Sequence, residues 1–223
     1  MIQLEKLEKC YGKGRNKVEV LRGLDLFLDT SVANIGILGA KSSGKSTLIK
    51  IIAGLEPPTR GRVTRHARVS WPLSWRGLGG GLSGDGQVFL LARFYGADRG
   101  GLLRFVAEVS GLGHKIYEPM KKYSGREKDR LLLAAALGLD FDIYLIDEAL
   151  PGVEPQHAEL YQLLLKEKLG RRRVIVASSH VSSLARYCQG AAILHGGTLS
   201  GFMPLDTAAQ CFQGLIRANT ERT

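Results

Sequence analysis

GAKSSGKST, residues 39–47, is the stretch that decides the fold of this 223-residue chain. It fits the pattern GxxxxGK[ST] and lies between a short apolar run at 32–38 and a helical pattern at 46–55. A strand, a glycine-rich loop and a helix in this order form a phosphate-binding P-loop. Its glycines let the backbone curl so that N–H groups face phosphate oxygens, while Lys45 reaches the outer phosphates and Ser46 offers its hydroxyl to Mg²⁺. The alternative, a chance turn rich in glycine and serine, does not account for this context.

Short apolar runs also occur on the far side of the loop, at 141–147 and 172–178, bounded by polar residues and separated by helical patterns. Such runs are typical of buried parallel strands. Residues 1–8 and 18–29 alternate instead between apolar and polar, which predicts an antiparallel flank. Residues 62–71 predict one further strand. The expected fold class is α/β, with a P-loop NTPase core of the RecA-like kind.

A helical sub-lobe is expected to interrupt this core, because only helical patterns occur from about 85 to 139. The stretch that precedes it, RGLGGGLSGDG (76–86), holds six glycines and is either a mobile linker or a backbone shaped around something. The predicted organisation is a single domain, 1–223, with a catalytic core at about 1–75 and 140–204, a helical sub-lobe at about 76–139 and a C-terminal helix at about 205–218.

Polar groups follow two of the predicted parallel strands. YLIDE (144–148) ends in Asp147, which would orient a phosphate-bound Mg²⁺ through its water, and Glu148, which could accept a proton from an attacking water or polarise it. His180 follows the next strand and so shares the carboxyl edge where ligands bind, within reach of a γ-phosphate or a water. The structural alternatives are an acidic pair that merely ends a strand and a surface histidine.

YSGREKDRLLLAAALG (123–138) turns from a polar stretch into a run of leucine and alanine. Ser124 and Glu127 fit a capping box, which satisfies free N–H groups at a helix start without any ligand. The same helix N-terminus could instead face an anion, because free N–H groups and the helix dipole favour a phosphate there. The two interpretations are compatible.

The motifs together carry a family resemblance. GAKSSGKST, IYLIDE (143–148) and VASSH (176–180), in this order with a helical lobe between the first two, resemble the nucleotide-binding subunit of ABC transporters. The stretches VSWPL, LARFYG and KYSGREKDRLLLA narrow the resemblance to the ATP-binding component of capsular-polysaccharide exporters, over nearly the whole chain.

The resemblance implies a site shared by two subunits that pair head to tail, each ATP lying between the P-loop of one and the signature of the other. Tyr11 would stack on adenine, unless it is a core or edge tyrosine. Glu148 and His180 would be catalytic. Ser46 and Asp147 would hold Mg²⁺. The implied ATP-binding residues are Tyr11, Gly39, Ala40, Lys41, Ser42, Ser43, Gly44, Lys45, Ser46, Thr47 and Asp147, and the trans signature is Ser124, Gly125, Arg126 and Glu127.

The chain departs from the family pattern at several positions. Arg126 stands where the signature has a glycine, Gly79 where a coupling loop has a glutamine, and Glu154 where a loop toward the opposite site has an aspartate. Gln87, the nearest glutamine to that coupling loop, falls in the following helix. These departures motivate an alternative, a weakly hydrolytic regulatory or heterodimer-partner subunit. Further departures, at P-loop positions that relatives commonly fill with Asn and Gly, are Lys41 and Ser42.

Composition bounds the partners and the location. The chain is 44% hydrophobic, shows no apolar run of the roughly 18 residues that span a bilayer, and begins without a signal-peptide core. Three distant cysteines suggest neither a zinc site nor a disulfide framework. A net charge of +10 leaves solvated faces, anionic lipid or nucleic acid open, but stacking aromatics between the basic residues are missing.

The resemblance to ABC transporter subunits implies an integral membrane permease and a second ATPase subunit as partners. Neither nucleic acid nor the transported substrate is expected to touch the chain. The expected location is the cytoplasmic face of the inner membrane, as a peripheral subunit.

Overall fold

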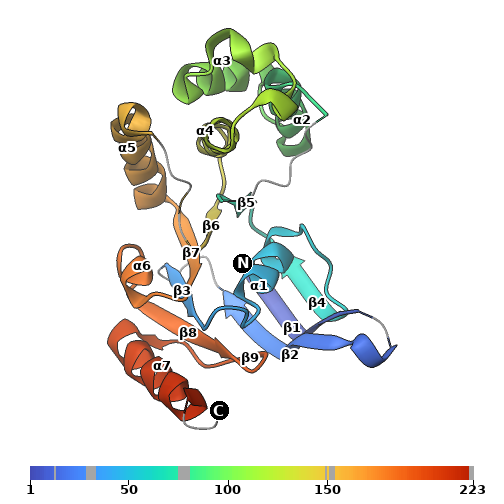
Figure 1. Cartoon of the computed structure of the whole chain (residues 1–223), viewed down its shortest axis with the longest axis vertical. Helices are drawn as coiled ribbons and strands as arrows, with labels where there is room; N and C mark the ends of the chain where they lie inside the picture. Colours follow the sequence, from blue (N-terminus) through green and yellow to red (C-terminus); the bar gives the residue numbers. More distant parts are fainter. Residues whose placement is uncertain (13, 29–33, 75–80, 149, 151–153, 221–223) are drawn as a thin grey trace. The chain divides into compact units, whose positions relative to one another are not determined.

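The computed structural model describes residues 1–12, 14–28, 34–74, 81–148, 150 and 154–220 (Figure 1). The chain divides into two compact units. Unit 1 comprises Met1–Pro72, Asp142–Ala149 and Arg173–Thr223, and unit 2 comprises Leu73–Phe141 and Leu150–Arg172. The division predicted from the sequence differs at 150–172, which it assigned to the core.

A three-stranded antiparallel sheet of unit 1 forms the flank that the alternating pattern predicted. Its strands are β1 (Ile2–Tyr11), β2 (Val18–Leu28) and β4 (Arg60–Arg65), in the order β2-β1-β4. Ile2 lies opposite Leu28 on one side and Arg65 on the other. The alternation of apolar and polar residues along β1 determines which face of this sheet is apolar.

The larger sheet of unit 1 has seven strands in the order β10-β8-β3-β7-β6-β5, with β9 paired to β8. The run β8-β3-β7-β6-β5 is parallel, as the apolar runs predicted. The three strands after residue 189 were not predicted from the sequence. The strands are β3 (Ile35–Leu38), β5 (Val69–Pro72), β6 (Ile143–Asp147), β7 (Arg173–Ser178), β8 (Gly190–His195), β9 (Thr198–Leu199) and β10 (Met203–Pro204).

The prediction of a single strand at 62–71 is wrong, because this stretch forms parts of β4 and β5, which belong to different sheets. The Arg65 guanidinium donates to the carbonyls of Ile51 and Ile52 at the end of helix α1 (Lys45–Ala53). Three residues later the N–H of Arg68 donates to the Asp142 carboxylate, 2.8 Å away, just before β6. These anchors move the chain from one sheet to the other, which an apolar pattern does not reveal.

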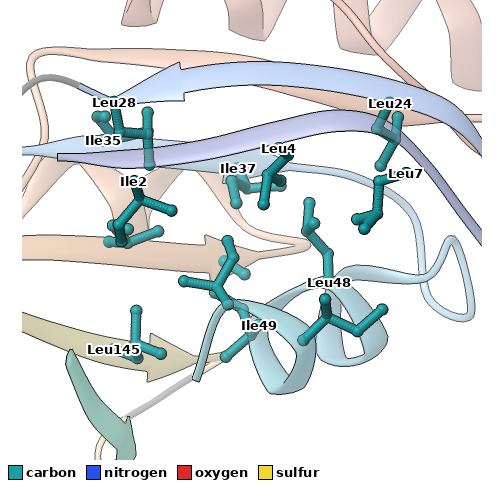
Figure 2. Packing of buried hydrophobic residues seen from close by; sticks show 14 of the residues in the cluster. Ile2, Leu4, Leu7, Leu24, Leu28, Ile35, Ile37, Leu48, Ile49 and Leu145 are labelled. Carbon is teal, nitrogen blue, oxygen red and sulfur yellow. The ribbon is translucent and has the colours of Figure 1, made fainter. Parts of the chain in front are cut away.

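The core of unit 1 lies between the two sheets and α1 (Figure 2). Ile2, Leu4 and Leu7 of β1 pack there with Ile37 of β3 and Leu48 of α1, and each is at most 2% exposed. Burying one such side chain contributes roughly 1.5–3 kcal/mol before the cost of ordering the chain. This core holds the loop between β3 and α1 against a rigid base.

The described part of unit 2 is helical. The chain enters α2 and α3 through the N-caps Ser83 and Asp98, whose side chains accept from the N–H groups of Gly86 and Gly101. Its elements are α2 (Gly84–Tyr95), α3 (Arg99–Ser110), η2 (Gly113–Tyr117), η3 (Met120–Lys122), α4 (Gly125–Gly138) and α5 (Pro155–Arg171).

Two more helices belong to unit 1, α6 (Val181–Ala185) and α7 (Leu205–Thr220). Helix α7 contacts β8 and β10, and it covers the span at which the sequence predicted a C-terminal helix. Within the described residues, the search for helices that meet the length and apolarity of a membrane span finds none.

Candidate functional site

The P-loop joins β3 to α1 along a backbone that only glycine fits at two points. A Cβ on Gly39 would lie 2.6 Å from the Ser43 hydroxyl, and Gly44 has a φ of 101° with Val20 2.8 Å from the position of a Cβ. The loop borders a cavity of about 280 Å³. The cavity is lined by Val20, Lys41, Ser42, Gly44, Lys45, Ser46, Thr47 and Glu148.

Lys45 is the first residue of α1, directly after the loop, and its side chain is only 4% exposed. Its Nζ donates to the carbonyls of Gly39 and Ala40, 2.9 and 2.8 Å away, and lies 3.0 Å from Oε1 of Glu148. The structure therefore joins the predicted phosphate-binding lysine and the predicted catalytic carboxylate in one ion pair. The ammonium lies beside the loop that borders the cavity.

Glu148 follows β6 in a left-handed conformation, with a φ of 63°. Its Oε2 accepts from the Ser179 N–H at 2.9 Å and from the hydroxyls of Ser179 and Ser178 at 3.1 and 3.2 Å. Burial raises the pKa of Glu148, but the hydrogen bonds from Ser179 and Lys45 outweigh it and hold the pKa below the ordinary value. The carboxylate is therefore ionised and aimed by β6 and β7 together.

Ser178 and Ser179 are site residues that the sequence analysis did not assign. Ser178 ends the predicted strand at 172–178 and Ser179 follows it, so their position at the sheet edge could have indicated a role. Which carboxylate they would hold could not be inferred, because the pairing depends on side-chain rotamers on two different strands.

Asp147 ends β6 and is a partly buried carboxyl group. Burial raises its pKa above the ordinary value; a hydrogen bond with the Ser46 hydroxyl lowers it, and the charge of Glu148 raises it further. The hydrogen bond shows that the Ser46 and Asp147 oxygens are neighbours. Two such hard oxygen donors beside a phosphate loop fit the ligand preference of Mg²⁺.

His180 lies where its strand predicted, at the carboxyl end of β7, and is the N-cap residue of α6. Its N–H donates to the Ser178 hydroxyl at 3.0 Å, the same hydroxyl that serves Glu148. The imidazole is exposed, and among the described residues it makes no hydrogen bond or ion pair. A catalytic role for this ring stays a prediction.

Tyr11 ends β1 with 40% of its surface exposed, which rules out the core interpretation. Its hydroxyl lies 3.2 Å from that of Thr47 in α1, and the Lys9 ammonium lies 5.1 Å from the ring centroid. Burial is the main cause that raises the pKa of Tyr11, so the hydroxyl is neutral. The ring is thus anchored at its polar end to the residue that follows Ser46, with part of the aromatic surface open.

The predicted signature residues lie in unit 2, where Ser124 caps α4. The Ser124 hydroxyl accepts from the Glu127 N–H at 3.2 Å, and the Glu127 carboxylate accepts from the Ser124 N–H at 2.8 Å. The capping box is therefore confirmed. Gly125 and Arg126, the first two residues of the helix, are exposed. Contact with a phosphate stays a prediction.

The remaining departures from the family pattern have separate outcomes. Gly79 lies outside the described residues. Gln87 lies in α2, as predicted, and is 1% exposed. Glu154 precedes α5 as its N-cap residue, and its Oε2 lies 3.6 Å from Nε of Arg130 in α4. Arg130 is a residue that the sequence analysis did not single out.

The parallel sheet, its P-loop and the carboxylate pair beside the P-loop lysine define a P-loop NTPase. Residues 30–151 match the family described as "ABC transporter", and the chain belongs to this family.

Two curated relatives align over almost the whole chain. The ATP-binding protein BexA of Haemophilus influenzae is 37% identical over 213 residues, covering 95% of this chain and 98% of its own. The capsule polysaccharide export ATP-binding protein CtrD of Neisseria meningitidis serogroup B is 36% identical over 216 residues, covering 96% and 100%. A solved dimer of the ATP-binding cassette MJ0796 with ADP and Pi has a TM-score of 0.72 at 21% identity, covers 92% of this chain and 99% of that one, and shows the fold.

Proposed function

We propose that this chain is the ATP-hydrolysing subunit of an ABC exporter of a polysaccharide, a capsule or a related glycan, and that it drives a separate membrane permease. The observation that carries the ATPase part is the ion pair between Lys45 and Glu148, 3.0 Å apart at the P-loop. The export part rests on the two relatives, one of which is described by capsule polysaccharide export and aligns over its full length.

Binding of ATP would replace the contacts that now hold Lys45. The ammonium donates to two loop carbonyls and pairs with Glu148, and the outer phosphates of ATP offer it a stronger anionic partner. Once Lys45 turns to phosphate, Glu148 loses a counter-charge and becomes a better proton acceptor. Binding of ATP and activation of Glu148 as a base are thereby linked through the Lys45–Glu148 ion pair.

Glu148 would then orient a water for in-line attack on the γ-phosphate. Phosphoryl transfer depends on positioning and electrostatics more than on covalent chemistry. Ser178 and Ser179 supply that positioning, because their three hydrogen bonds fix Oε2 and leave Oε1 as the atom released by Lys45. His180 follows directly and would position the water or bind the γ-phosphate.

Mg²⁺ would be held by Ser46 and Asp147. When bound with ATP, the ion neutralises charge that develops on the β- and γ-phosphate oxygens. Tyr11 would stack on adenine with its open aromatic surface while Thr47 holds its hydroxyl.

Two cassettes would close over two nucleotides, with Ser124, Gly125, Arg126 and Glu127 of each facing the ATP of the other. Closure would move an integral membrane permease, which carries the polysaccharide without contact to this chain. The chain would act as a peripheral subunit on the cytoplasmic face of the inner membrane, without nucleic acid as a partner. Among the described residues no observation favours the weakly hydrolytic alternative, because Lys45, Asp147 and Glu148 all lie at the P-loop.

The hydrolysis proposal is tested with the purified chain, ATP and Mg²⁺. Glu148→Gln should lower turnover by about 10²- to 10⁴-fold, the range of a lost general base, while ATP still binds. Lys45→Ala should abolish binding itself. Equal turnover of the wild-type chain and Glu148→Gln would refute hydrolysis by this site.

The export proposal is tested in the source cell. Removal of this chain should abolish surface polysaccharide, and the wild-type chain but not Glu148→Gln should restore it. Normal surface polysaccharide in cells that lack the chain would count against the export role while leaving the ATPase intact.

A further inference from the structure

The N-terminus of α4 carries an electrostatic conflict. If it faces the phosphates of a partner's ATP, as the proposed function requires, its free N–H groups favour the anion. Glu127, however, lies in the first turn of the same helix end. An ionised carboxylate near a phosphate opposes its approach, and water excluded from a closed site would strengthen that repulsion.

Lys115 in η2 resolves this conflict by pairing with both oxygens of the carboxylate. Its Nζ donates to Oε1 of Glu127 at 2.8 Å and to Oε2 at 3.0 Å. Oε2 also accepts the Ser124 N–H, so both oxygens of the carboxylate are engaged. The bond from Lys115 is the largest cause that lowers the pKa of Glu127, which keeps this carboxylate ionised.

Tyr123, the residue before the N-cap Ser124, contacts Lys115 and holds it in place. The Tyr123 hydroxyl donates to the Lys115 carbonyl at 2.6 Å, and the ammonium lies 5.8 Å from the Tyr123 ring centroid. Burial raises the pKa of Tyr123 to about 12, so this hydroxyl is a donor at physiological pH. The lysine side chain is 35% exposed and the Glu127 side chain 19%, which leaves the pair less screened than most surface pairs.

We propose that Lys115 is a positioning residue of the composite ATP site, which holds Glu127 in the capping box and cancels its charge. Together the two side chains supply a neutral polar group at the start of α4. The electrostatic field at the start of α4 is then positive. Its sources are the N–H groups of Gly125 and Arg126, which have no intrahelical partner, and the exposed Arg126 guanidinium. This rests on the proposed function, and under it Arg126 attracts the trans phosphate.

A charge-rescue experiment on the full chain tests the proposal. Lys115→Met should lower kcat/KM for ATP roughly tenfold, because an uncompensated carboxylate then faces an anion. Adding Glu127→Gln should restore most of this loss, since glutamine also completes a capping box and needs no counter-charge. Raising the salt concentration should narrow the gap between Lys115→Met and the wild-type chain.

Lys122→Met is the matched control, because it removes a lysine whose partner Glu118 lies 3.4 Å away on the exposed surface of the same unit. It should leave turnover unchanged. Lys115→Gln keeps a hydrogen-bond donor while removing the charge, and serves as the test should Lys115→Met not fold. Lys115→Arg should retain activity.

Two outcomes would contradict the role of Lys115 while leaving the proposed function intact. One is Lys115→Met turnover equal to that of Lys122→Met in a chain whose wild-type turnover depends on Glu148. The other is a loss in Lys115→Met that Glu127→Gln does not rescue and that follows a drop in thermal stability, which would show a role in folding only. If the wild-type chain has no turnover above Glu148→Gln, the proposed function itself fails, and that result is read independently of Lys115.

Discussion

At the residue scale, Asp147 and Glu148 are adjacent carboxyl groups whose pKa values shift in opposite directions. Burial dominates at Asp147 and raises its pKa, whereas hydrogen bonds from Ser179 and Lys45 win at Glu148 and lower it. A carboxyl group with a raised pKa in the folded state removes stability as the pH rises through that value, and one with a lowered pKa adds stability. The two residues therefore contribute with opposite signs at neutral pH.

Asp147→Asn should raise the melting temperature of the nucleotide-free chain at pH 7, because it removes a carboxylate that is costly to ionise in its buried setting. The gain should vanish below the ordinary pKa of 3.8, where the carboxyl is protonated in both folded and unfolded states. Glu148→Gln is the opposite-sign control: it should lower the melting temperature at pH 7, with the loss fading as the pH falls below 4.5. Thermal scans across pH check both, and a loss at pH 7 in Asp147→Asn would contradict the sign.

Ser42 gives a second prediction at this scale, because it is a non-glycine residue with a φ of 64°. The left-handed conformation costs an L-residue about 1–2 kcal/mol, and glycine avoids this cost. The larger conformational entropy of glycine in the unfolded chain offsets part of that gain. Ser42→Gly should therefore raise the free energy of unfolding by up to about 1 kcal/mol in urea denaturation. Ser43→Gly, the same change next to it without a positive φ, should instead destabilise, and equal effects of the two would remove the strain argument.

The sequence predicted the positions of residues whose geometry depends on local order along the chain, and the roles assigned to them stay predictions. The P-loop, the Asp147 and Glu148 pair and the Ser124 capping box each occupy a short window, so their pattern contains their geometry. It did not find Ser179 on Glu148 or Lys115 on Glu127, because those contacts depend on rotamers of residues from different elements. The left-handed φ of Ser42 is likewise set by the loop's closure rather than by its residue type.

At the element scale, Arg130 in α4 contacts both the N-cap residue and the first half of α5. Arg130, whose side chain is 8% exposed, lies 3.6 Å from the Glu154 carboxylate, and its carbonyl accepts from the Tyr161 hydroxyl at 2.8 Å. The helix that carries the signature is thus fixed to the helix that follows Glu154. The sequence predicted α4 from its cap and apolar run, but this junction could not be predicted, because nothing in either segment specifies the other.

Glu154→Gln should destabilise the chain by about 1–3 kcal/mol, because it leaves the buried Arg130 charge without its counter-ion. Glu154→Asp, one methylene shorter, should also destabilise, since the pair is already 3.6 Å apart. Chemical denaturation measures both. Glu167→Gln is the matched control on α5: its pair with Arg171 is exposed at 3.4 Å and should contribute at most about 0.5 kcal/mol. Equal effects at Glu154 and Glu167 would mean that the junction is not stabilising.

At the scale of the whole molecule, the net charge of +10 does not by itself define a partner. Two runs of basic residues, at 121–122 and 171–173, contribute to this charge and are partly neutralised within the chain. Lys122 pairs with Glu118 at 3.4 Å and Arg171 with Glu167 at 3.4 Å, on exposed surface. This favours solvated faces, and it leaves membrane association to the permease, as the proposed function requires.

Association of two chains is the prediction that belongs to this scale, because each proposed ATP site needs the P-loop of one chain and the predicted signature of another. Glu148→Gln should convert from monomer to dimer when ATP is added, since it binds ATP and cannot hydrolyse it, and the dimer should dissociate when ATP is removed. Sedimentation velocity with and without ATP measures the change.

Two further substitutions are combined with Glu148→Gln. Lys45→Ala should keep the chain monomeric, because it abolishes ATP binding. Lys115→Met should leave ATP binding normal but weaken the dimer, because the uncompensated charge of Glu127 then faces the partner's ATP. An ATP-independent dimer in all three variants would show that association does not depend on shared nucleotide, and the head-to-tail arrangement would have to be abandoned.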